Sequence, residues 1–134
     1  MNYWLMKSEP FKYSWEQLLK DKKTSWDGVR NFQAANNLRA MEKGDRAFFY
    51  HSNEGKEIVG IVEIVKTAYL DPSDETGKFV MVDVKPVEAV KNSVTLAQIK
   101  SQKSLQNMAL LKQSRLSVSP VTKAEWAYIC KLAA

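Results

Sequence analysis

Between residues 44 and 87 the chain carries apolar segments separated only by short polar turns, and this pattern constrains the fold most. RAFFYHS (46–52) and EIVGIVEIVKTA (57–68) are joined by NEGK, which predicts a hairpin. The polar loop DPSDETG (71–77) follows, and KFVMVDVKPV (78–87) resumes a period-two alternation. Because β-branched residues such as Val59 and Ile61 favour strands over helices, the sequence predicts a strand meander.

Two helices are predicted between this meander and the N-terminal strand YWLM (3–6), which is closed by KSEP and its proline. Ser14 with Gln17 matches a capping box, and Asn31 is a plausible N-cap. The apolar sides of the two helices are expected to consist of Trp15, Leu18 and Leu19, and of Phe32, Ala35 and Leu38.

After the meander, Thr95 with Gln98 indicates another short helix, and LQNMALL (105–111) is predicted to be helical. RLSVSPV (115–121) is predicted to be extended. The last helix is the best specified, because Thr122 and Glu125 form a capping box and Val121 can pack on Trp126. Grouped helices around a meander favour an α+β fold, specifically a small, partly closed barrel with helices at its ends.

A chain of 134 residues and 15.3 kDa is long enough for one core, so residues 1–134 are predicted to form a single domain. The sequence has no run of 18 apolar residues and no basic-then-apolar leader, so neither a membrane span nor a secretory signal is expected. The single cysteine, Cys130, excludes an internal disulfide, suits a reducing cytoplasm and is expected to be a buried, unreactive thiol.

The net charge of +5 is unevenly distributed. Residues 91–134 carry seven basic side chains against the single acid Glu125, whereas the first 90 residues carry 13 basic and 14 acidic ones. Clustered Lys and Arg favour a polyanionic partner, although solvated helix faces would give the same count.

The sequence gives little support for a catalytic site. His51 and Ser52 are neighbours on a predicted strand, where adjacent side chains point to opposite faces, so they cannot share a proton. His51 is better explained as a hydrogen-bonded residue at the end of the barrel. With a single histidine, the chain lacks the ligands of most zinc sites. Neither of the nucleotide-binding motifs GxGxxG and GxxxxGK[ST] occurs. No catalytic residue, metal or cofactor is therefore predicted.

The stretch WDGVRNFQAANNLR (26–39) gives the positive signal, because it joins an aromatic residue to several amides with little charge. A nucleobase needs an aromatic face for stacking and edge groups that donate and accept hydrogen bonds. Trp26 or Tyr50 could provide the face, and Ser8, Asn31, Ser52 and the amides around Gly28 the edges. Candidate phosphate contacts are Lys7, Arg30, Arg39, Lys112 and Arg115.

Each of these residues also has a purely structural interpretation. Trp26 could belong to the core, as is expected for Trp4, Trp15 and Trp126. Gly28 could serve only a left-handed turn, Arg30 could pair with Asp27, and Ser117 could simply face water. From the residues alone, both interpretations remain open.

Several segments together resemble the EVE domain family. They are YWLMKSEP (3–10), YSWEQL (13–18), WDGVRNFQAANNLRAM (26–41), GDRAFFYHSN (44–53), IVGIVEIV (58–65) and RLSVSPVT (115–122). The resemblance covers nearly the whole chain. It implies a PUA-like fold, a mixed β pseudo-barrel flanked by short helices and related to YTH and ASCH domains.

The resemblance also implies a base-binding cleft. Its residues would be Lys7, Ser8, Glu9, Trp26, Asp27, Gly28, Val29, Arg30, Asn31, Tyr50, His51, Ser52, Leu116, Ser117 and Val118.

The function implied is non-enzymatic binding of DNA that carries a methylated or hydroxymethylated cytosine, with restriction-type defence partners in bacteria. Binding of RNA or a modified tRNA is one alternative, and a nucleotide-processing hydrolase that uses Glu9 or Asp27 with Lys7 is another. A bacterial chain would be cytoplasmic and a eukaryotic one nuclear.

Overall fold

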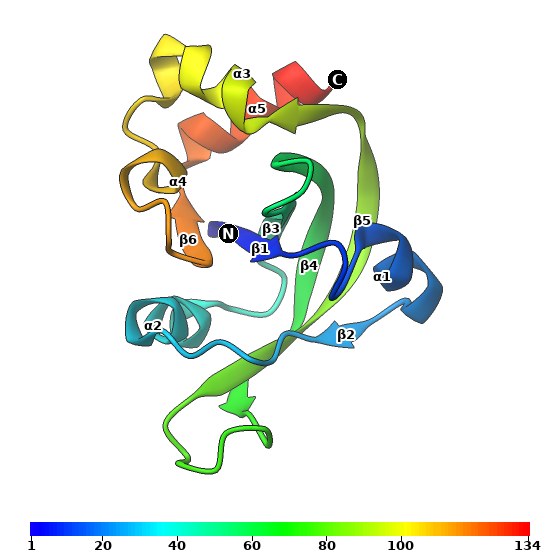
Figure 1. Ribbon diagram of the computed structural model, residues 1–134, viewed down its shortest axis with the longest axis vertical. Coiled ribbons are helices and arrows are strands. Elements are labelled where there is room, and N and C mark those ends of the chain that lie inside the picture. Colours follow the sequence, from blue (N-terminus) through cyan, green and yellow to red (C-terminus); the bar gives the residue numbers. More distant parts are fainter.

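The computed structural model describes all 134 residues, and it combines strands with short helices (Figure 1). The strands are β1 (Tyr3–Ser8), β2 (Thr24–Ser25), β3 (Arg46–His51), β4 (Glu57–Leu70), β5 (Val80–Thr95) and β6 (Val118–Val121). The helices are α1 (Trp15–Asp21), α2 (Phe32–Ala40), α3 (Leu96–Ser101), the 3₁₀ helix η1 (Lys103–Leu105), α4 (Ala109–Lys112) and α5 (Lys123–Ala133).

The six strands form one mixed sheet in the order β2-β5-β4-β3-β1-β6. The predicted meander is confirmed as the antiparallel run β3-β4-β5. β1 lies parallel to β3, which is possible because α1, β2 and α2 form a long crossover between them. The prediction of an α+β fold is therefore confirmed.

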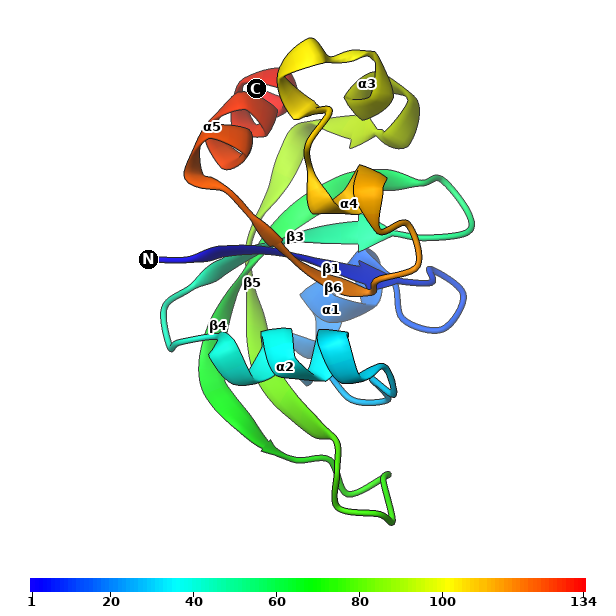
Figure 2. The same ribbon diagram turned by 90° about the vertical axis from the view of Figure 1, so that its left-hand side faces the viewer.

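The sheet curls but does not close on itself (Figures 1 and 2). Its outer strands β2 and β6 are not hydrogen-bonded to each other. Helix α2 packs against β6, β5 and β4, so it fills the gap between the two edges. β4 and β5 have 14 and 16 residues, longer than predicted, and their length carries the sheet around the core.

Both faces of the curled sheet are buried, and strand alternation divides the core in two. Trp4 and Met6 of β1 belong to one apolar cluster, together with Trp15, Trp26 and Phe49. Leu5 and Phe48 belong to a second cluster, which includes Trp126 and is covered by α3, η1, α4 and α5. Within the second cluster Trp126 stacks on Phe48 and on Tyr3.

A bulge in β4 fits α1 against the sheet. Phe49 pairs with Gly60 and Tyr50 pairs with Ile58, so Val59 is the extra residue. A Cβ atom on Gly60 would lie 2.4 Å from the nearest carbon of the Trp15 ring. The absence of a side chain at Gly60 is therefore what admits the Trp15 indole.

Helix starts follow the predicted caps. Thr95 and Thr122 form full capping boxes with Gln98 and Glu125, and the Asn31 side chain accepts the N–H of Ala34. The box at Ser14 is only half formed, since Gln17 donates its N–H to Ser14 but directs its side chain to Asp21.

Three predictions about helices are wrong. Phe32 is 61% exposed because it is the first residue of α2, and its ring stacks on Phe79 instead of entering the core. Leu19 is largely exposed, because α1 buries only Trp15 and Leu18. The segment 105–111 is not one helix: η1 ends at Leu105, and α4 begins at Ala109.

Candidate nucleic-acid interface

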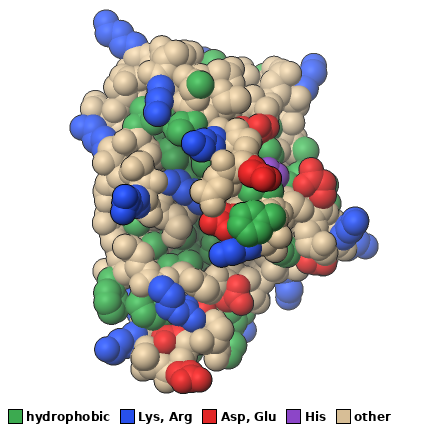
Figure 3. Space-filling model, viewed as in Figure 1, with side chains coloured by type: hydrophobic (Ala, Val, Ile, Leu, Met, Phe, Trp, Pro, Cys, Tyr) green, Lys and Arg blue, Asp and Glu red, His purple; other side chains and the backbone are tan.

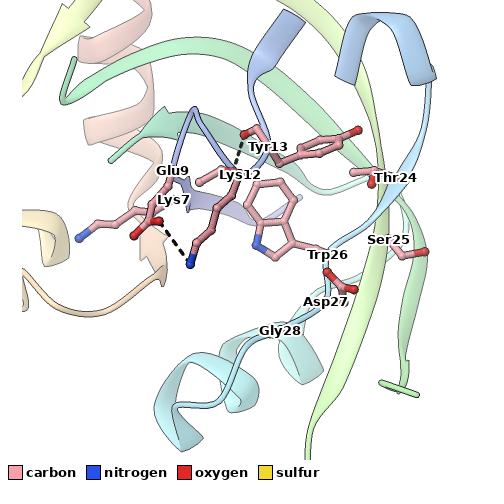
Figure 4. A pocket seen from close by; sticks show the side chains of 10 residues that line it. Lys7, Glu9, Lys12, Tyr13, Thr24, Ser25, Trp26, Asp27 and Gly28 are labelled. Atoms are coloured by element: carbon pink, nitrogen blue, oxygen red, sulfur yellow. Dashed lines mark hydrogen bonds and ion pairs between the residues drawn. The ribbon is translucent and has the colours of Figure 1, made fainter. Parts of the chain in front are cut away.

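A cavity of about 460 Å³ opens where β1 ends beside β2 (Figure 4). Three short segments form its wall: the end of β1 with the following turn, strand β2, and the loop that leads to α2. The lining residues are Lys7, Ser8, Glu9, Lys12, Tyr13, Thr24, Ser25, Trp26, Asp27 and Gly28. The lining is thus mostly polar, with both donors and acceptors.

Trp26 lies at the boundary between this cavity and the core. Only 8% of the residue is exposed, and its ring meets Phe49 edge to face at 5.5 Å. Its indole N–H is neither hydrogen-bonded within the protein nor sealed from solvent, whereas the indole N–H of Trp4 donates to Asp45. In Figure 4 the indole nitrogen faces the side of the cavity where Lys12 and Glu9 lie. Trp26 therefore offers a free donor more than an open aromatic face.

The turn after β1 is braced by hydrogen bonds. The N–H groups of Lys12 and Tyr13 both donate to the carbonyl of Glu9, at 3.0 and 2.9 Å. The Ser8 hydroxyl donates to the carbonyl of Tyr13 (2.6 Å), and Glu9 accepts from Asn53 and pairs with Lys12. Ser8 and Glu9 are thus held in place without a ligand.

Asp27 is the acid in the cavity whose carboxylate is free. It makes no hydrogen bond or ion pair with another side chain, whereas Glu9 is paired and the buried Asp45 accepts three N–H groups. Of the two acids that the hydrolase alternative would use, Glu9 is therefore already engaged and only Asp27 is free.

Asp71, on the loop between β4 and β5, fixes the far end of the cavity wall. Its buried carboxylate accepts from the N–H of Gly28 (2.9 Å), from Arg30 (3.1 Å), and from the N–H and hydroxyl of Ser73. Burial alone would raise the pKa of Asp71, but these hydrogen bonds outweigh it and lower the pKa to about 2. Arg30 pairs with Asp71 and not with Asp27, because the loop folds back onto this segment.

A second hollow of about 340 Å³ adjoins the first at Lys7. It also carries Lys56 and Lys100, and it has no acidic residue. Burial lowers the pKa of Lys7, whose ammonium donates to the carbonyl of Ser114 at 2.7 Å. The other lining residues are Tyr50, Ser52, Asn53, Leu96, Leu110, Leu111 and Ser114. We refer to this site as the lysine hollow.

A third hollow of about 390 Å³ joins the start of α2 to the segment before β6. It is lined by Asn31, Gln33, Lys112, Gln113, Ser114, Arg115 and Leu116. Ser114 also lines the lysine hollow, so the three hollows follow one another across the surface. Lys and Arg side chains spread over the left half of this face, and acidic side chains gather toward its right half (Figure 3).

The structure distributes the predicted cleft residues over these hollows instead of gathering them in one. Six of them line the cavity beside Trp26, namely Lys7, Ser8, Glu9, Trp26, Asp27 and Gly28. Tyr50 and Ser52 line the lysine hollow, and Asn31 and Leu116 line the third. Val29 and Val118 are buried in the core, where their side chains cannot reach a ligand.

The remaining predicted residues have structural partners. His51 accepts the N–H of Trp15 at its Nε2 atom (3.1 Å), which confirms a hydrogen-bonded histidine at the end of its strand. The carbonyl of Ser117 accepts the N–H of Lys7. Arg39 donates to Asn36 and to the carbonyl of Lys78, which draws it toward the β4–β5 loop and away from all three hollows.

Four residues of the cavity were missed by the sequence interpretation: Lys12, Tyr13, Thr24 and Ser25. Lys12 and Tyr13 follow KSEP directly, so the bracing of that turn could have indicated them. Thr24 and Ser25 form the two-residue strand β2, whose pairing with β5 leaves no periodic signal in the sequence.

The sequence model of the EVE domain family matches residues 2–132 of the chain. The chain belongs to the EVE domain family. This EVE domain is 40% identical to human thymocyte nuclear protein 1, in an alignment that covers 98% of the chain and 73% of the human protein.

Solved structures agree in fold over the whole length. Rpa0253 from Rhodopseudomonas palustris is 53% identical, with a TM-score of 0.94 over 99% of this chain and 93% of the other. Human THYN1 in complex with DNA containing 5-methylcytosine is 40% identical, with a TM-score of 0.93 over 99% and 98%.

A more distant likeness extends to the YTH domain of Zygosaccharomyces rouxii MRB1, solved with N6-methyladenosine RNA. At 15% identity and a TM-score of 0.62, over 98% of this chain and 86% of the other, it is a likeness of fold alone. The expectation of a PUA-like α+β fold is confirmed. No helix of this EVE domain has the length and apolar character needed to cross a bilayer.

Proposed function

We propose that this EVE domain is a non-enzymatic reader that binds nucleic acid and accepts a modified base, such as methylated or hydroxymethylated cytosine, in the cavity beside Trp26. The observation that carries the proposal is the free indole N–H of Trp26 in a polar cavity of about 460 Å³. Small-molecule pockets are commonly about 300–1,000 Å³, so one nucleoside head fits. The complex of human THYN1, 40% identical, with 5-methylcytosine DNA supports a base of this kind.

The donors and acceptors of the cavity suit the edge of cytosine. Cytosine carries an exocyclic amino donor, for which a carboxylate is a good acceptor, and Asp27 provides a free one. The Trp26 N–H would donate to an acceptor on the ring, and the Ser8 hydroxyl, which donates to Tyr13, keeps lone pairs that accept. With 8% of Trp26 exposed, its contribution is a hydrogen bond more than a stacking platform.

The lysine hollow would hold the backbone next to the bound base. Lys7 lines both hollows, so a strand whose base enters the first cavity would pass Lys7 on its way to Lys56 and Lys100. Clustered ammonium groups displace counterions from phosphates and give sequence-independent affinity. Arg30, held by Asp71, would contribute less to this binding than the sequence suggested.

A test compares the affinity of the protein for single strands that carry cytosine, 5-methylcytosine or 5-hydroxymethylcytosine, by fluorescence anisotropy at fixed salt. Tighter binding of one modified strand is the expected result, and equal affinity for all of them would remove the proposed function. A parallel series of RNA strands decides between DNA and RNA as the partner, since only RNA offers a 2′-hydroxyl.

Trp26→Phe keeps an aromatic ring against Phe49 but removes the N–H. We expect it to weaken binding of the modified strand by ~0.5–1.5 kcal/mol, the usual net value of one hydrogen bond. Trp126→Phe is the matched control, because Trp126 is 9% exposed but lies in the other core cluster. If both variants bind as the wild type does, the Trp26 N–H has no part in recognition.

A hydrolase is the weaker alternative. Glu9 is paired with Lys12 and Asn53, and the Lys7 ammonium donates to the carbonyl of Ser114, so two of the three side chains that a hydrolase would use are already engaged. Only the Asp27 carboxylate is free to act as a base. Turnover of any nucleotide that is lost in Glu9→Gln would favour this alternative over a reader.

A restriction-type defence partner and a cytoplasmic or nuclear location stay predictions.

A further inference from the structure

Phe11 is a large apolar side chain that the fold leaves in solvent. It is 69% exposed, more than any other aromatic residue of the chain. The other strongly exposed aromatic, Phe32, has its ring stacked on Phe79 at 4.9 Å, whereas the Phe11 ring has no aromatic partner. Packing therefore explains Phe32 but not Phe11.

The position of Phe11 relates it to the cavity. It is the middle residue of the turn Glu9–Tyr13, and Glu9, Lys12 and Tyr13 of that turn line the cavity beside Trp26. The Lys12 ammonium lies 6.0 Å from the centre of the Phe11 ring. An apolar ring with an adjacent positive charge thus stands at the margin of the hollow.

The turn holds the backbone at Phe11 in a fixed place. Two N–H groups, of Lys12 and Tyr13, donate to the carbonyl of Glu9, and Pro10 restricts the backbone just before Phe11. Asn53 and Ser8 tie both ends of the turn to the body of the protein. Such bracing lowers the entropic cost of using an exposed side chain in binding.

We propose that Phe11 is a wedge that enters the base stack of duplex DNA at the step from which the modified base is taken into the cavity. The proposal rests on the proposed function, since it needs a base in the cavity. Removing a base from a duplex costs stacking and pairing free energy, and apolar side chains inserted at the step offset part of that cost. Lys12, beside the ring, would contact the backbone phosphate at the opened step.

The experiment measures binding of the wild type and Phe11→Ala to the same modified strand in two forms, single-stranded and annealed. A single strand has no duplex to open. We expect Phe11→Ala to weaken duplex binding about fivefold to about a hundredfold, the range of one base–aromatic stack, and to leave single-strand binding nearly unchanged. Phe11→Leu keeps an apolar wedge and should retain part of the duplex affinity.

Leu70→Ala is the matched control, because Leu70 is 64% exposed at the end of β4 and lines none of the three hollows. A second measurement places 2-aminopurine next to the modified base. Its emission should rise when the wild type binds the duplex and rise less with Phe11→Ala. Substitution of an exposed residue should leave thermal unfolding unchanged, which is checked for each variant.

Three results would overturn the wedge. The first is that Phe11→Ala loses equal affinity for the single strand and the duplex, and the second is that it loses no affinity for the duplex. The third is that the wild type binds the modified single strand but not the duplex. Single-strand binding by the wild type tests the proposed function separately, because Phe11 is not needed there. A failure of the wedge is therefore distinguishable from a failure of base recognition.

Discussion

Trp26 has two roles that the sequence interpretation treated as alternatives. Its ring belongs to the same apolar cluster as Phe49 and Trp15, and its N–H edge borders the cavity. A single residue can serve both because an indole has one polar atom at one edge of a large apolar body. Which edge faced the cavity depended on the packing of Phe49, a residue 23 positions away in the sequence.

Asp71 shows a second residue whose role depends on distant partners. It lies in a loop that the sequence marks only as polar, yet it anchors Gly28 and Arg30, more than 40 positions earlier. Pairing of Arg30 with Asp27 was one interpretation of the sequence, since those residues are close in sequence. The carboxylate of Asp71 is the better partner because it is buried and accepts several donors at once.

Asp71→Asn should lower the free energy of unfolding by ~1–3 kcal/mol at neutral pH, because the amide cannot satisfy all the donors around the carboxylate. The folded-state pKa of about 2 lies below the ordinary 3.8, so the carboxylate stabilises the fold above about pH 4 and loses this effect as the pH falls toward 2. Urea unfolding at pH values from 7 to 2 measures the free energy of unfolding. The difference in this free energy between wild type and variant should become smaller as the pH falls.

Asp27→Asn is the control for Asp71→Asn, since Asp27 is a neighbouring exposed carboxylate without a side-chain partner. It should unfold as the wild type does throughout. Equal stability of Asp71→Asn and the wild type at pH 7 would mean that the hydrogen bonds to Asp71 carry no net free energy.

Among the elements, β4 has the feature that most depends on contact with another element. The bulge at Val59 and the missing side chain at Gly60 let α1 lie against the strand through Trp15. A glycine inside a strand pattern marks such bulges and close approaches. The sequence interpretation treated 57–68 as a regular strand and had no partner to place beside Gly60.

Gly60→Ala should therefore destabilise the protein by about 1–3 kcal/mol, the usual cost of overpacking, because its new Cβ would lie 2.4 Å from the Trp15 ring. Chemical denaturation measures the change. Trp15→Phe removes ring atoms at this contact, so the double variant should lose less than the sum of the two single variants. An equal cost of Gly60→Ala in both backgrounds would place the strain elsewhere.

Element types with local signals were predicted well, and those without them were not. The starts of α2, α3 and α5 follow from side-chain caps within three residues, so they are visible in the sequence. The segment 105–111 divides into η1 and α4 because the backbone is extended at Met108, between the two helices, and Met108 is buried in the same cluster as Leu105 and Leu110. β2 has two residues and exists only through its pairing with β5.

At the scale of the whole molecule, only some of the basic side chains of residues 91–134 lie at the hollows. Lys100 joins Lys7 and Lys56 in the lysine hollow, while Lys112 and Arg115 line the third hollow. Lys123 and Lys131 lie on α5 and line none of the three hollows. The charge count thus indicates a polyanionic partner, but the fold decides which lysines can meet it.

Lys56→Ala and Lys100→Ala should each weaken binding of a single strand at low salt. Each should also reduce the slope of log K against log salt by about 0.7, the value for one lost phosphate contact. Lys131→Ala changes the net charge equally but outside the hollows, so it should leave the slope unchanged. Titrations at several salt concentrations measure the slope. Equal slopes for all three variants would mean that the lysine hollow does not take part in binding.

The sequence by itself determined the strand meander, the helix starts and the EVE family pattern, because alternation and capping are interactions between residues at most a few positions apart. Only the tertiary structure decided that β1 runs parallel to β3, that Arg30 meets Asp71 and that the predicted cleft divides into three hollows. It also left the Trp26 N–H open and Phe11 in solvent. These features depend on contacts between segments tens of residues apart, which form only when burial of the core brings those segments together.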